Sequence, residues 1–382
     1  MKNDAYPPVS IVIVNYNGRK WLEKCIPSVL ATQYPNFEVV LADNASYDGS
    51  IEFVKLNYPC VKIVQHPTNL GFSNGVNLAL SVCNGEFIAV LNNDVEVETT
   101  WLVELVNALK KDNTIGIVSP KKKLLDDPGL LDGAGGVQNI FGYGWDRGQG
   151  EMDGKYENLT EVLHPPGAAF LVRRELVKEY GFLLNPDFFY LFEDADLGLR
   201  SWLAGYKVVY VPSSIIWHAR APSIGGHSYR TTKFMYTHVL ASYYEVFGLK
   251  FLIEFLPVFF SVRLLYGLLW LKVKHDSVLC LVLPSAIFNF LSNFPKYAAI
   301  RYIVRRNTAV DPRTLLDRFT DEGALPNSVL QYMSAYKRFL WLTGLYVKHV
   351  IRAKPVSKIR ILAEDRFKYV YRRPLDEIHD KH

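Results

Sequence analysis

Short apolar runs alternate with helical patterns through the first half of the chain. The runs at residues 9–14, 37–41, 61–64 and 87–91 suit strands that are buried in a parallel sheet. Between the first two runs, apolar residues recur at helical spacing over residues 21–30. This repeated alternation of strand and helix predicts an α/β fold with a mostly parallel sheet.

Polar residues stand where these apolar runs end. They are Asn15, Asp43, Asn69 and the sequence Asn92-Asn93-Asp94. In an open α/β sheet, ligands bind at the carboxyl ends of the strands, so these side chains are expected to share one crevice. The Asp94 carboxylate suits a hard divalent cation. An isolated Asn-Asn-Asp also fits a polar turn that simply ends a strand, so the prediction depends on the other strand ends.

A second acidic cluster, Glu193-Asp194-Ala195-Asp196, follows an aromatic run and begins a predicted helix. Acidic residues stabilise helix N-termini, so the cluster alone fits a helix cap equally well. Together with Asp43 and Asp94 it fits transfer from a phosphate ester. That chemistry needs a metal for the leaving diphosphate and a carboxylate that accepts a proton. His218 follows another predicted strand, where a lone histidine is commonly structural, although imidazole also suits Mn²⁺.

Seven segments, in order, carry a resemblance to a known family: VSIVIVNYNG, VVLADNASYDGS, NLGFSNGVNLAL, FIAVLNNDVEV, PPGAAFLVRRE, FYLFEDADLGLR and GYKVVYVPSSIIWH. Over residues 8–220 the chain resembles family 2 glycosyltransferases with the Rossmann-like GT-A fold, and in particular their rhamnosyltransferase-like branch. The resemblance implies an inverting enzyme that moves a sugar from a UDP- or dTDP-sugar to an acceptor hydroxyl by single displacement. It also implies a divalent cofactor, Mn²⁺ or Mg²⁺.

The resemblance also implies roles for individual residues. Asp194 would be the catalytic base, and Asp94 would hold the metal together with His218. The residues implied to bind the nucleotide-sugar, with Asp43 accepting the N3–H of a uracil or thymine ring, are Asn15, Tyr16, Asp43, Asn69, Gly71 and Asn93. The residues implied to line the acceptor side are Gly167, Ala168 and Glu193. Two departures from the family pattern are that Asn92 and Asn93 replace earlier acids and that His218 lacks the usual His-x-x-Gly spacing.

Beyond about residue 230 the pattern changes to long apolar runs among Lys and Arg clusters. Residues 251–271 are interrupted by Glu254 and Arg263, whereas residues 277–295 are uncharged for 19 residues. Basic flanks predict a membrane-associated region at the cytoplasmic face, either a hairpin or two helices lying in the interface. Residues 336–352 suit a basic amphipathic helix. A buried helical subdomain or an interface between copies is the alternative, which leaves a homo-oligomer open.

The predicted organisation is a catalytic domain at residues 1–230, an apolar helical, membrane-associated region at 231–310 and a basic amphipathic helical tail at 311–382. Apolar residues make up 49% of the 382 residues, which indicates a large core rather than disorder. The four cysteines are widely spaced without a CxxC pair, so we expect neither a zinc site nor a disulfide framework. The net charge of +5 does not by itself imply nucleic acid, and no nucleic-acid partner is expected. The N-terminal residues lack the apolar run of a secretory signal peptide.

Two other functions are compatible with parts of the sequence. A sugar-phosphate nucleotidyltransferase would use a similar acid cluster, but it normally needs a glycine-rich basic phosphate loop, and Arg19-Lys20 is a poor match. A membrane-tethered nucleotide- or glycan-binding scaffold would not need Asp194. The sequence does not identify the sugar or the acceptor, which is expected to be a lipid-linked glycan, a polysaccharide or another glycoconjugate such as a glycosylated protein.

Overall fold

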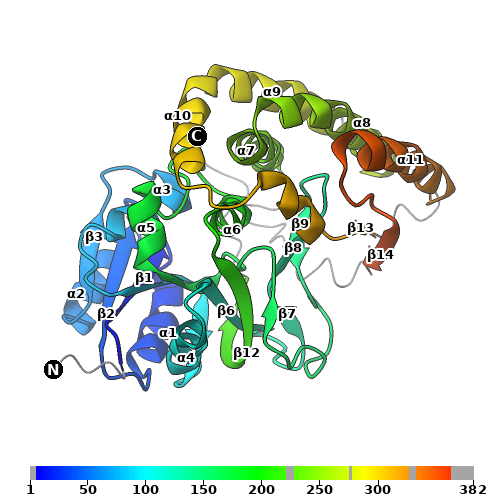
Figure 1. The fold of residues 1–382 in the computed structure, drawn as a ribbon. Helices are drawn as coiled ribbons and strands as arrows, with labels where there is room; N and C mark the ends of the chain where they lie inside the picture. The colour runs from blue at the N-terminus through cyan, green and yellow to red at the C-terminus, as the bar shows by residue number, and fades with distance from the viewer. Residues whose placement is uncertain (1–5, 221–227, 275–277, 327–332, 363–382) are drawn as a thin grey trace.

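The computed structural model describes residues 6–220, 228–274, 278–326 and 333–362 (Figure 1). A 10-stranded sheet crosses the molecule in the order β10-β12-β6-β11-β4-β1-β2-β3, with β5 added to β12 and β7 added to β6. Its first four strands are β1 (Val9–Asn15), β2 (Phe37–Asp43), β3 (Lys62–Gln65) and β4 (Phe87–Asn92). These four pair in parallel, as the sequence predicts. The helices between them are α1 (Arg19–Leu30), α2 (Ser50–Asn57) and α3 (Gly71–Ala79).

The second half of the sheet is mixed. Strand β11 (Ala169–Arg173) lies between β4 and β6 (Ile115–Leu124) and is antiparallel to both, whereas β12 (Lys207–His218) runs parallel to β6. The expectation of a mostly parallel sheet is therefore correct for β1 to β4 but not for the whole sheet. The reason is that β11 is entered through a turn at residues 165–168 and runs back along β4. The other elements here are β5 (Val95–Val97), β7 (Leu131–Gly133), β8 (Gly136–Gln138), β9 (Gly144–Asp146), β10 (Thr160–Glu161), α4 (Trp101–Lys111), α5 (Arg174–Tyr180) and α6 (Glu193–Leu203).

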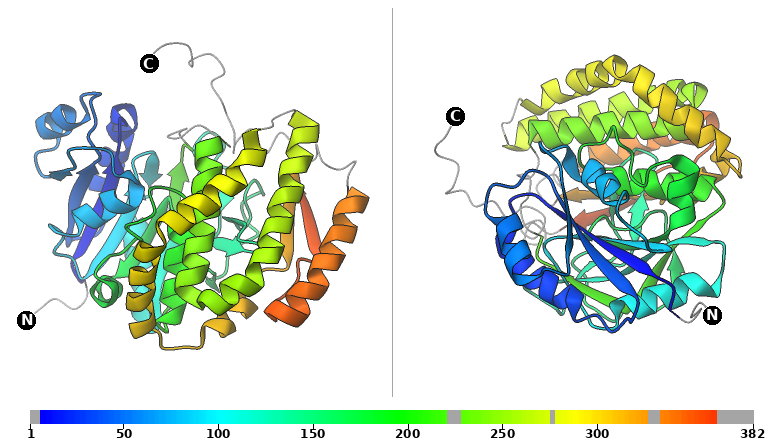
Figure 2. Two further views of the ribbon diagram at one scale, coloured as in Figure 1. Left: turned by 90° about the horizontal axis from the view of Figure 1, so that it is seen from above. Right: turned by 90° about the vertical axis from the view of Figure 1, so that its left-hand side faces the viewer.

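Both faces of the sheet are covered, which explains the nearly continuous apolar runs of its strands. Alternate residues of β1, such as Ile11 and Ile13, join a core with α1, α2 and α4. The residues between them, such as Val12 and Val14, face a second core with α3, α5 and α6. Helices accordingly lie on both sides of the sheet (Figure 2). A strand buried on both faces has no polar side, so its first polar residues come where it ends.

The C-terminal helices cover one face of this α/β unit. Helix α7 (Tyr229–Phe247) packs against α6, and α8 (Leu249–Lys274), α9 (Val278–Ser292) and α10 (Phe294–Arg306) lie over α7 (Figures 1 and 2). The remaining elements are a 3-10 helix (Pro312–Arg318), β13 (Glu322–Pro326), α11 (Met333–Tyr346), a π-helix (Val347–Ile351) and β14 (Lys358–Leu362). One hydrophobic core includes side chains of α6, α7, α8, α9 and α10.

The expected helices at residues 251–271 and 277–295 correspond to α8 and α9. The basic helix expected at 336–352 is α11 with its π-helical continuation, but the region from residue 311 also contains the parallel pair β13–β14. Residues 363–382 of the expected tail lie outside the described residues. Within the described ranges, no helix has the length and apolarity that crossing a membrane requires.

Arg263, which interrupts the apolar run of α8, has a protein partner. The residue is 2% exposed, and its guanidinium donates to the Phe141 carbonyl oxygen at 2.8 Å. It also lies over the rings of Tyr143 and Tyr236, at 3.8 and 4.6 Å from their centroids. This charge therefore fastens α8 to the rest of the fold.

Candidate functional site

The end of β4 and the end of β12 bring Asp94 and His218 together. Strand β5 follows Asp94 directly and pairs antiparallel with β12, with His218 opposite Val95. His218 Nε2 consequently lies 3.3 Å from Asp94 Oδ1, and the Asp94 side chain is buried. Two residues that are more than a hundred positions apart in sequence thus form one polar corner at the carboxyl edge of β4.

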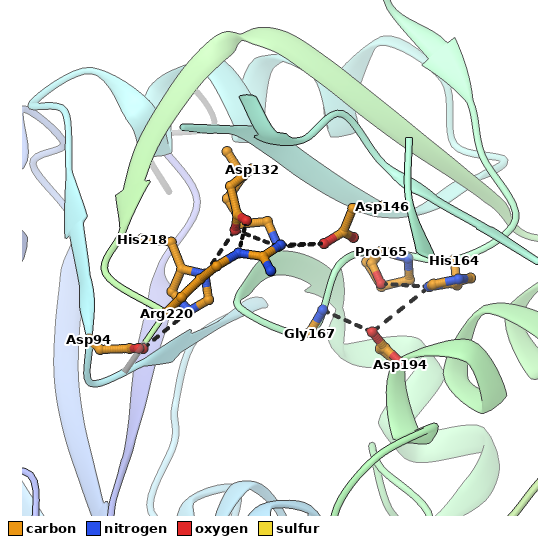
Figure 3. Close-up of polar contacts among 10 residues, drawn as sticks. Asp94, Asp132, Asp146, His164, Pro165, Gly167, Asp194, His218 and Arg220 are labelled. Atoms are coloured by element: carbon orange, nitrogen blue, oxygen red, sulfur yellow. Dashed lines mark hydrogen bonds and ion pairs between the residues drawn. The ribbon is translucent and has the colours of Figure 1, made fainter. Parts of the chain in front are cut away.

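A third residue, Asp132 of β7, holds the other side of the histidine ring (Figure 3). Its Oδ2 lies 2.9 Å from His218 Nδ1 and 2.9 Å from Lys122 Nζ, and its Oδ1 pairs with Arg220. Lys122 also reaches Asp146 Oδ2 at 2.7 Å. Sequence reasoning missed this network. No local motif reveals it, because its members come from β6, β7, β9 and the chain after β12.

Charge pairing dominates this network. Burial alone would raise the pKa of Asp132, but Lys122 and Arg220 hold it well below its usual range. Burial alone would lower the pKa of His218, but the charge of Asp94 and the hydrogen bond that His218 donates to Asp132 raise it to about 9. His218 is therefore a protonated bridge between two carboxylates when no metal is bound.

Asp94 and His218 fit a divalent cation. Oδ1 and Nε2 lie 3.3 Å apart, so both can contact one ion. Nδ1 donates to a carboxylate, which is the arrangement that orients metal-binding histidines. Within the described residues, no group of three or more His, Cys, Asp and Glu side chains is placed to hold a metal ion. Asp94 and His218 would supply two ligands.

The ends of β1, β2 and β4 are joined by a second polar network. Asn15 Nδ2 donates to Asp43 Oδ1 at 3.0 Å, and Asn93 Nδ2 donates to Asn15 Oδ1 at 2.8 Å. Asp43 is fully buried, and it also accepts hydrogen bonds from the backbone and hydroxyl of Ser46. Three of the expected donor-binding residues, Asn15, Asp43 and Asn93, are therefore directly connected.

A surface pocket of about 390 Å³ lies beside Asp43. It is lined by Ala45, Ser46, Gln65, His66 and Pro67. Gln65 Nε2 donates to Asp43 Oδ2 at 3.3 Å, so the pocket wall touches the buried carboxylate. Tyr16, at the end of β1, is exposed.

Gly71, one of the residues expected to bind the nucleotide-sugar, contacts the segment before Asp194. Its φ is +86°, and a Cβ on it would overlap the Phe189 carbonyl oxygen. The next residue, Phe72, donates its N–H to that same oxygen at 2.8 Å. Asn69 Oδ1 accepts from the Gly71 N–H at 2.9 Å and so fixes the turn into α3. Asn69 and Gly71 therefore hold the start of α3 against the backbone of Phe189.

Asp194 lies in the first turn of α6 and is oriented by backbone donors. Its Oδ2 accepts from the Gly167 N–H at 3.0 Å (Figure 3). Its Oδ1 accepts from the Ala195 N–H at 2.7 Å. The side chain remains 25% exposed. Ala168 is buried, and its carbonyl oxygen accepts from the Asn92 N–H at 3.0 Å, which ties this turn to the end of β4.

The neighbouring acids point elsewhere. Asp196 is fully buried and binds Arg200 Nε at 2.7 Å and the Ser242 hydroxyl at 2.8 Å. Burial, followed by repulsion from Asp194, raises the pKa of Glu193 to about 8. Glu193 is therefore protonated at neutral pH.

Tyr190 precedes this acidic cluster in the chain. Burial, followed by the negative charges of Glu193, Asp94 and Asp194, raises the pKa of Tyr190 to about 12. Its hydroxyl therefore stays protonated and lies within electrostatic reach of both the Asp94 corner and Asp194.

A strained turn precedes Asp194. Leu191 and Phe192 have φ values of +71° and +75°, a region that side chains other than glycine rarely adopt. His238 of α7 holds this turn, because its Nδ1 lies 2.7 Å from the Leu191 carbonyl oxygen and its ring stacks on Phe188 with centroids 4.2 Å apart. Burial lowers the pKa of His238 to about 4, so the ring is neutral and donates from Nδ1. Sequence reasoning missed His238, whose long-range contact has no local signal.

Comparison with known proteins gives the family. Residues 10–181 match the model for glycosyl transferase family 2. The N-acetylglucosaminyl-diphospho-decaprenol L-rhamnosyltransferase of Mycobacterium tuberculosis is 30% identical over 244 residues, which cover 56% of this chain and 77% of that enzyme. The O-antigen biosynthesis protein RfbC of Myxococcus xanthus is 30% identical over 230 residues, which cover 57% of this chain and 18% of that protein.

The fold agrees with a solved structure as well. The crystal structure of S. aureus TarS aligns with a TM-score of 0.50 at 15% identity, over 80% of this chain and 54% of that chain. The chain therefore belongs to glycosyl transferase family 2 and is an enzyme with a GT-A-like mixed α/β sheet. Within the family it is a rhamnosyltransferase-like protein, and its reaction is glycosyl transfer.

Proposed function

We propose that the protein is an inverting, metal-dependent glycosyltransferase that uses a UDP- or dTDP-sugar and acts on a hydroxyl of a lipid-linked glycan, a polysaccharide or another glycoconjugate. The observation that carries this proposal is the Asp194 carboxylate, which is partly exposed, oriented by two backbone N–H groups and separate from the Asp94–His218 pair. The relative from Mycobacterium tuberculosis, which is named as an L-rhamnosyltransferase for a diphospho-decaprenol substrate, supports a lipid-linked acceptor.

In the proposed reaction, Asp194 accepts the proton of the acceptor hydroxyl as the hydroxyl oxygen attacks the anomeric carbon. The bond from that carbon to the nucleoside diphosphate breaks on the opposite face, so the configuration inverts. The Gly167 and Ala195 N–H groups keep the carboxylate in place without neutralising it. Asp94 and His218 would hold Mn²⁺ or Mg²⁺. The ion would neutralise the negative charge that develops on the leaving diphosphate. Glu193 is buried and protonated, so it adds no second negative charge next to Asp194.

On the donor side, the pocket beside Asp43 would take the nucleotide base. Gln65 reaches Asp43 Oδ2 from an exposed position and at the long distance of 3.3 Å. The N3–H of a uracil or thymine ring would replace this donor and leave the bonds from Asn15 and Ser46 intact. Asn93, bound to Asn15, would place the nucleotide next to the Asp94 corner. We further propose that residues 1–230 form the catalytic domain and that the protein works at the cytoplasmic face of the cell membrane.

Asp194→Asn tests the proposal. The amide keeps the size of the side chain but cannot accept the proton, so kcat is expected to fall by about 100- to 10,000-fold. The donor dissociation constant, measured by calorimetry with Mn²⁺, should stay within about twofold of the parent value. Glu193→Gln is the matched control and should retain transfer, because Glu193 is already uncharged. Turnover of Asp194→Asn close to that of the parent enzyme would rule out the proposed base.

A further inference from the structure

The outer helices α8, α9 and α11 each bury one face and expose another that is also apolar. The buried face of α8 carries Phe251, Phe255 and Phe259, and that of α9 carries Val282 and Phe290. These faces join the core above α7, so the helices lie flat along the protein. The exposed apolar residues of the three helices are Leu249, Ile253, Leu264, Leu268, Leu271, Leu281, Phe288, Leu291, Trp341, Leu342 and Leu345.

These exposed side chains form stripes rather than isolated points. On α8, positions 253, 264 and 268 are separated by eleven and four residues, and on α9 positions 281, 288 and 291 by seven and three. Both spacings return to the same side of a helix. Helix α8 contacts both α9 and the π-helix that continues α11, and the three helices lie side by side in the view from above (Figure 2). Their outer faces thus form one surface, which we call the outer apolar face.

Positive charge accompanies this face. Lys and Arg recur through α8, α10, α11 and the π-helix, whereas Glu254 is the single acid in the sequences of α8 to α11 and the π-helix. Glu254 is itself paired with Arg313 at 3.0 Å. Lys250, Lys337 and Lys348 are exposed beside the apolar residues. In the helices that the structure describes here, the apolar surface has basic neighbours and the one acid is paired, which fits an anionic lipid surface.

We propose that the outer apolar face binds the surface of a bilayer that contains anionic phospholipid, with α8, α9 and α11 lying parallel to the membrane plane. Phe288 and Trp341, which are 73% and 66% exposed, would enter the boundary between headgroups and acyl chains. The basic side chains would meet the phosphate groups. This inference rests on the proposed function in one respect, namely that a lipid-linked acceptor gives the enzyme a reason to bind a membrane.

The layer order places this face close to the catalytic segment. Helix α7 lies between the outer helices and α6. Through His238, the same α7 binds the Leu191 carbonyl oxygen, three residues before Asp194. One helix layer therefore separates the lipid-binding surface from the turn that carries the proposed base. The sugar end of a lipid-linked acceptor could therefore approach Asp194 while its lipid stays in the membrane.

A second copy of the chain is the competing occupant of this face. In a two-fold dimer the same surface meets itself, so the basic residues of one copy would lie opposite those of the other. Like charges across an interface oppose association, and the described part of this face offers no unpaired acid to offset them. The charge pattern thus favours lipid over a second copy.

Vesicle flotation of the full-length protein tests the inference. Vesicles of phosphatidylcholine mixed with phosphatidylglycerol should carry the protein upward, and vesicles of phosphatidylcholine alone should carry much less. Added salt should weaken the binding, because surface charges are screened. The triple variant Leu268→Asp/Phe288→Asp/Trp341→Asp should lose more than about 100-fold in partitioning. Leu56→Asp is the matched control, since Leu56 is 83% exposed on α2, and it should bind like the parent.

The possible results distinguish binding of lipid from contacts between copies of the chain. Undiminished binding by the triple variant, with an unchanged melting temperature, would overturn the assignment of this face. So would absence of vesicle binding together with a concentration-dependent dimer that the triple variant abolishes, which would assign the face to contacts between copies. Flotation uses neither donor nor acceptor. Failure of the Asp194→Asn test therefore would not affect this result, and failure of flotation would leave the catalytic proposal standing.

Discussion

At the scale of single residues, the site depends on which acid keeps its charge. Asp94, Asp132 and Asp194 face cations or backbone N–H groups, whereas Glu193 is buried next to another carboxylate. Burial opposes every charged form, so each charged acid in this site has an identifiable partner. The two proposed roles therefore differ in the partners of the carboxylates: Asp94 faces a histidine, whereas Asp194 faces backbone N–H groups.

Asp132→Asn should weaken metal-dependent donor binding, although Asp132 itself would not touch the donor. The amide removes the negative charge that orients His218 through Nδ1, and a loss of about 10- to 100-fold in Mn²⁺ affinity is expected. Asp94→Ala removes a ligand and should lose more. Both are measured by titrating Mn²⁺ in the presence of the nucleotide. Asp146→Asn is the control, because it leaves the Asp132–His218 contact in place. Equal Mn²⁺ affinity in Asp132→Asn and the parent would contradict the positioning role.

Glu193 makes stability depend on pH. Its pKa rises from 4.5 in the unfolded chain to about 8 in the folded protein, so the folded state holds more protons between these values. The free energy of unfolding should therefore decrease as pH rises through this window, by at most about 1.4 kcal/mol per pH unit. Below the window the group is protonated in both states and costs nothing.

Glu193→Gln should remove this slope, because the amide does not titrate. Urea unfolding of the parent and the variant at several pH values between about 4.5 and about 8 measures the difference. Parallel pH curves for the two proteins would show that Glu193 does not titrate in this range.

At the scale of elements, two junctions hold the segment from Phe189 to Asp194. Helix α7 holds it through His238, and the start of α3 holds it through Gly71. Neither junction follows from local propensity. Helix α7 contributes a side chain from its middle and α3 contributes its first turn, and both contact backbone carbonyl groups of this segment.

His238→Phe should lower kcat more than it changes the donor KM. The phenyl ring keeps the stacking on Phe188 but leaves the Leu191 carbonyl without its donor, so the strained turn before Asp194 is free to shift. A misplaced base is expected to cost about 10- to 100-fold in kcat. His238→Asn should restore much of the rate, because its amide nitrogen can replace Nδ1. Equal rates for the Phe and Asn variants would exclude a role for this hydrogen bond.

Gly71→Ala should destabilise the fold more than Gly181→Ala. Both glycines have positive φ, +86° and +79°, but a Cβ at Gly71 would overlap the Phe189 carbonyl oxygen, whereas a Cβ at Gly181 meets open space. The Gly181 variant isolates the cost of the backbone conformation, about 1 kcal/mol, and the Gly71 variant adds the steric overlap. Urea unfolding of the two variants measures the difference. Similar losses would mean that the Phe189 segment moves away freely.

At the scale of the whole molecule, the sheet unit and the C-terminal helices share one hydrophobic core. Tyr236 and Tyr243 of α7 belong to the same cluster as Phe188 and Leu197. The proposed boundary at residue 230 therefore separates regions by composition, but it passes through a continuous packing layer. The long apolar runs of α8 and α9 serve two surfaces at once, one turned toward α7 and the other outward.

The sequence alone determined the parallel strands β1 to β4, the polar residues at their ends and the family resemblance, because apolar periodicity and turn chemistry are local properties. It also predicted where α8 and α9 lie along the chain. Only the tertiary structure decided that β11 runs antiparallel, that Asp132 and Lys122 support His218, and that His238 holds the turn before Asp194. It also decided that Arg263 faces protein. Each of these depends on contacts between residues far apart in the chain, where pairing and burial, rather than local pattern, choose the partner.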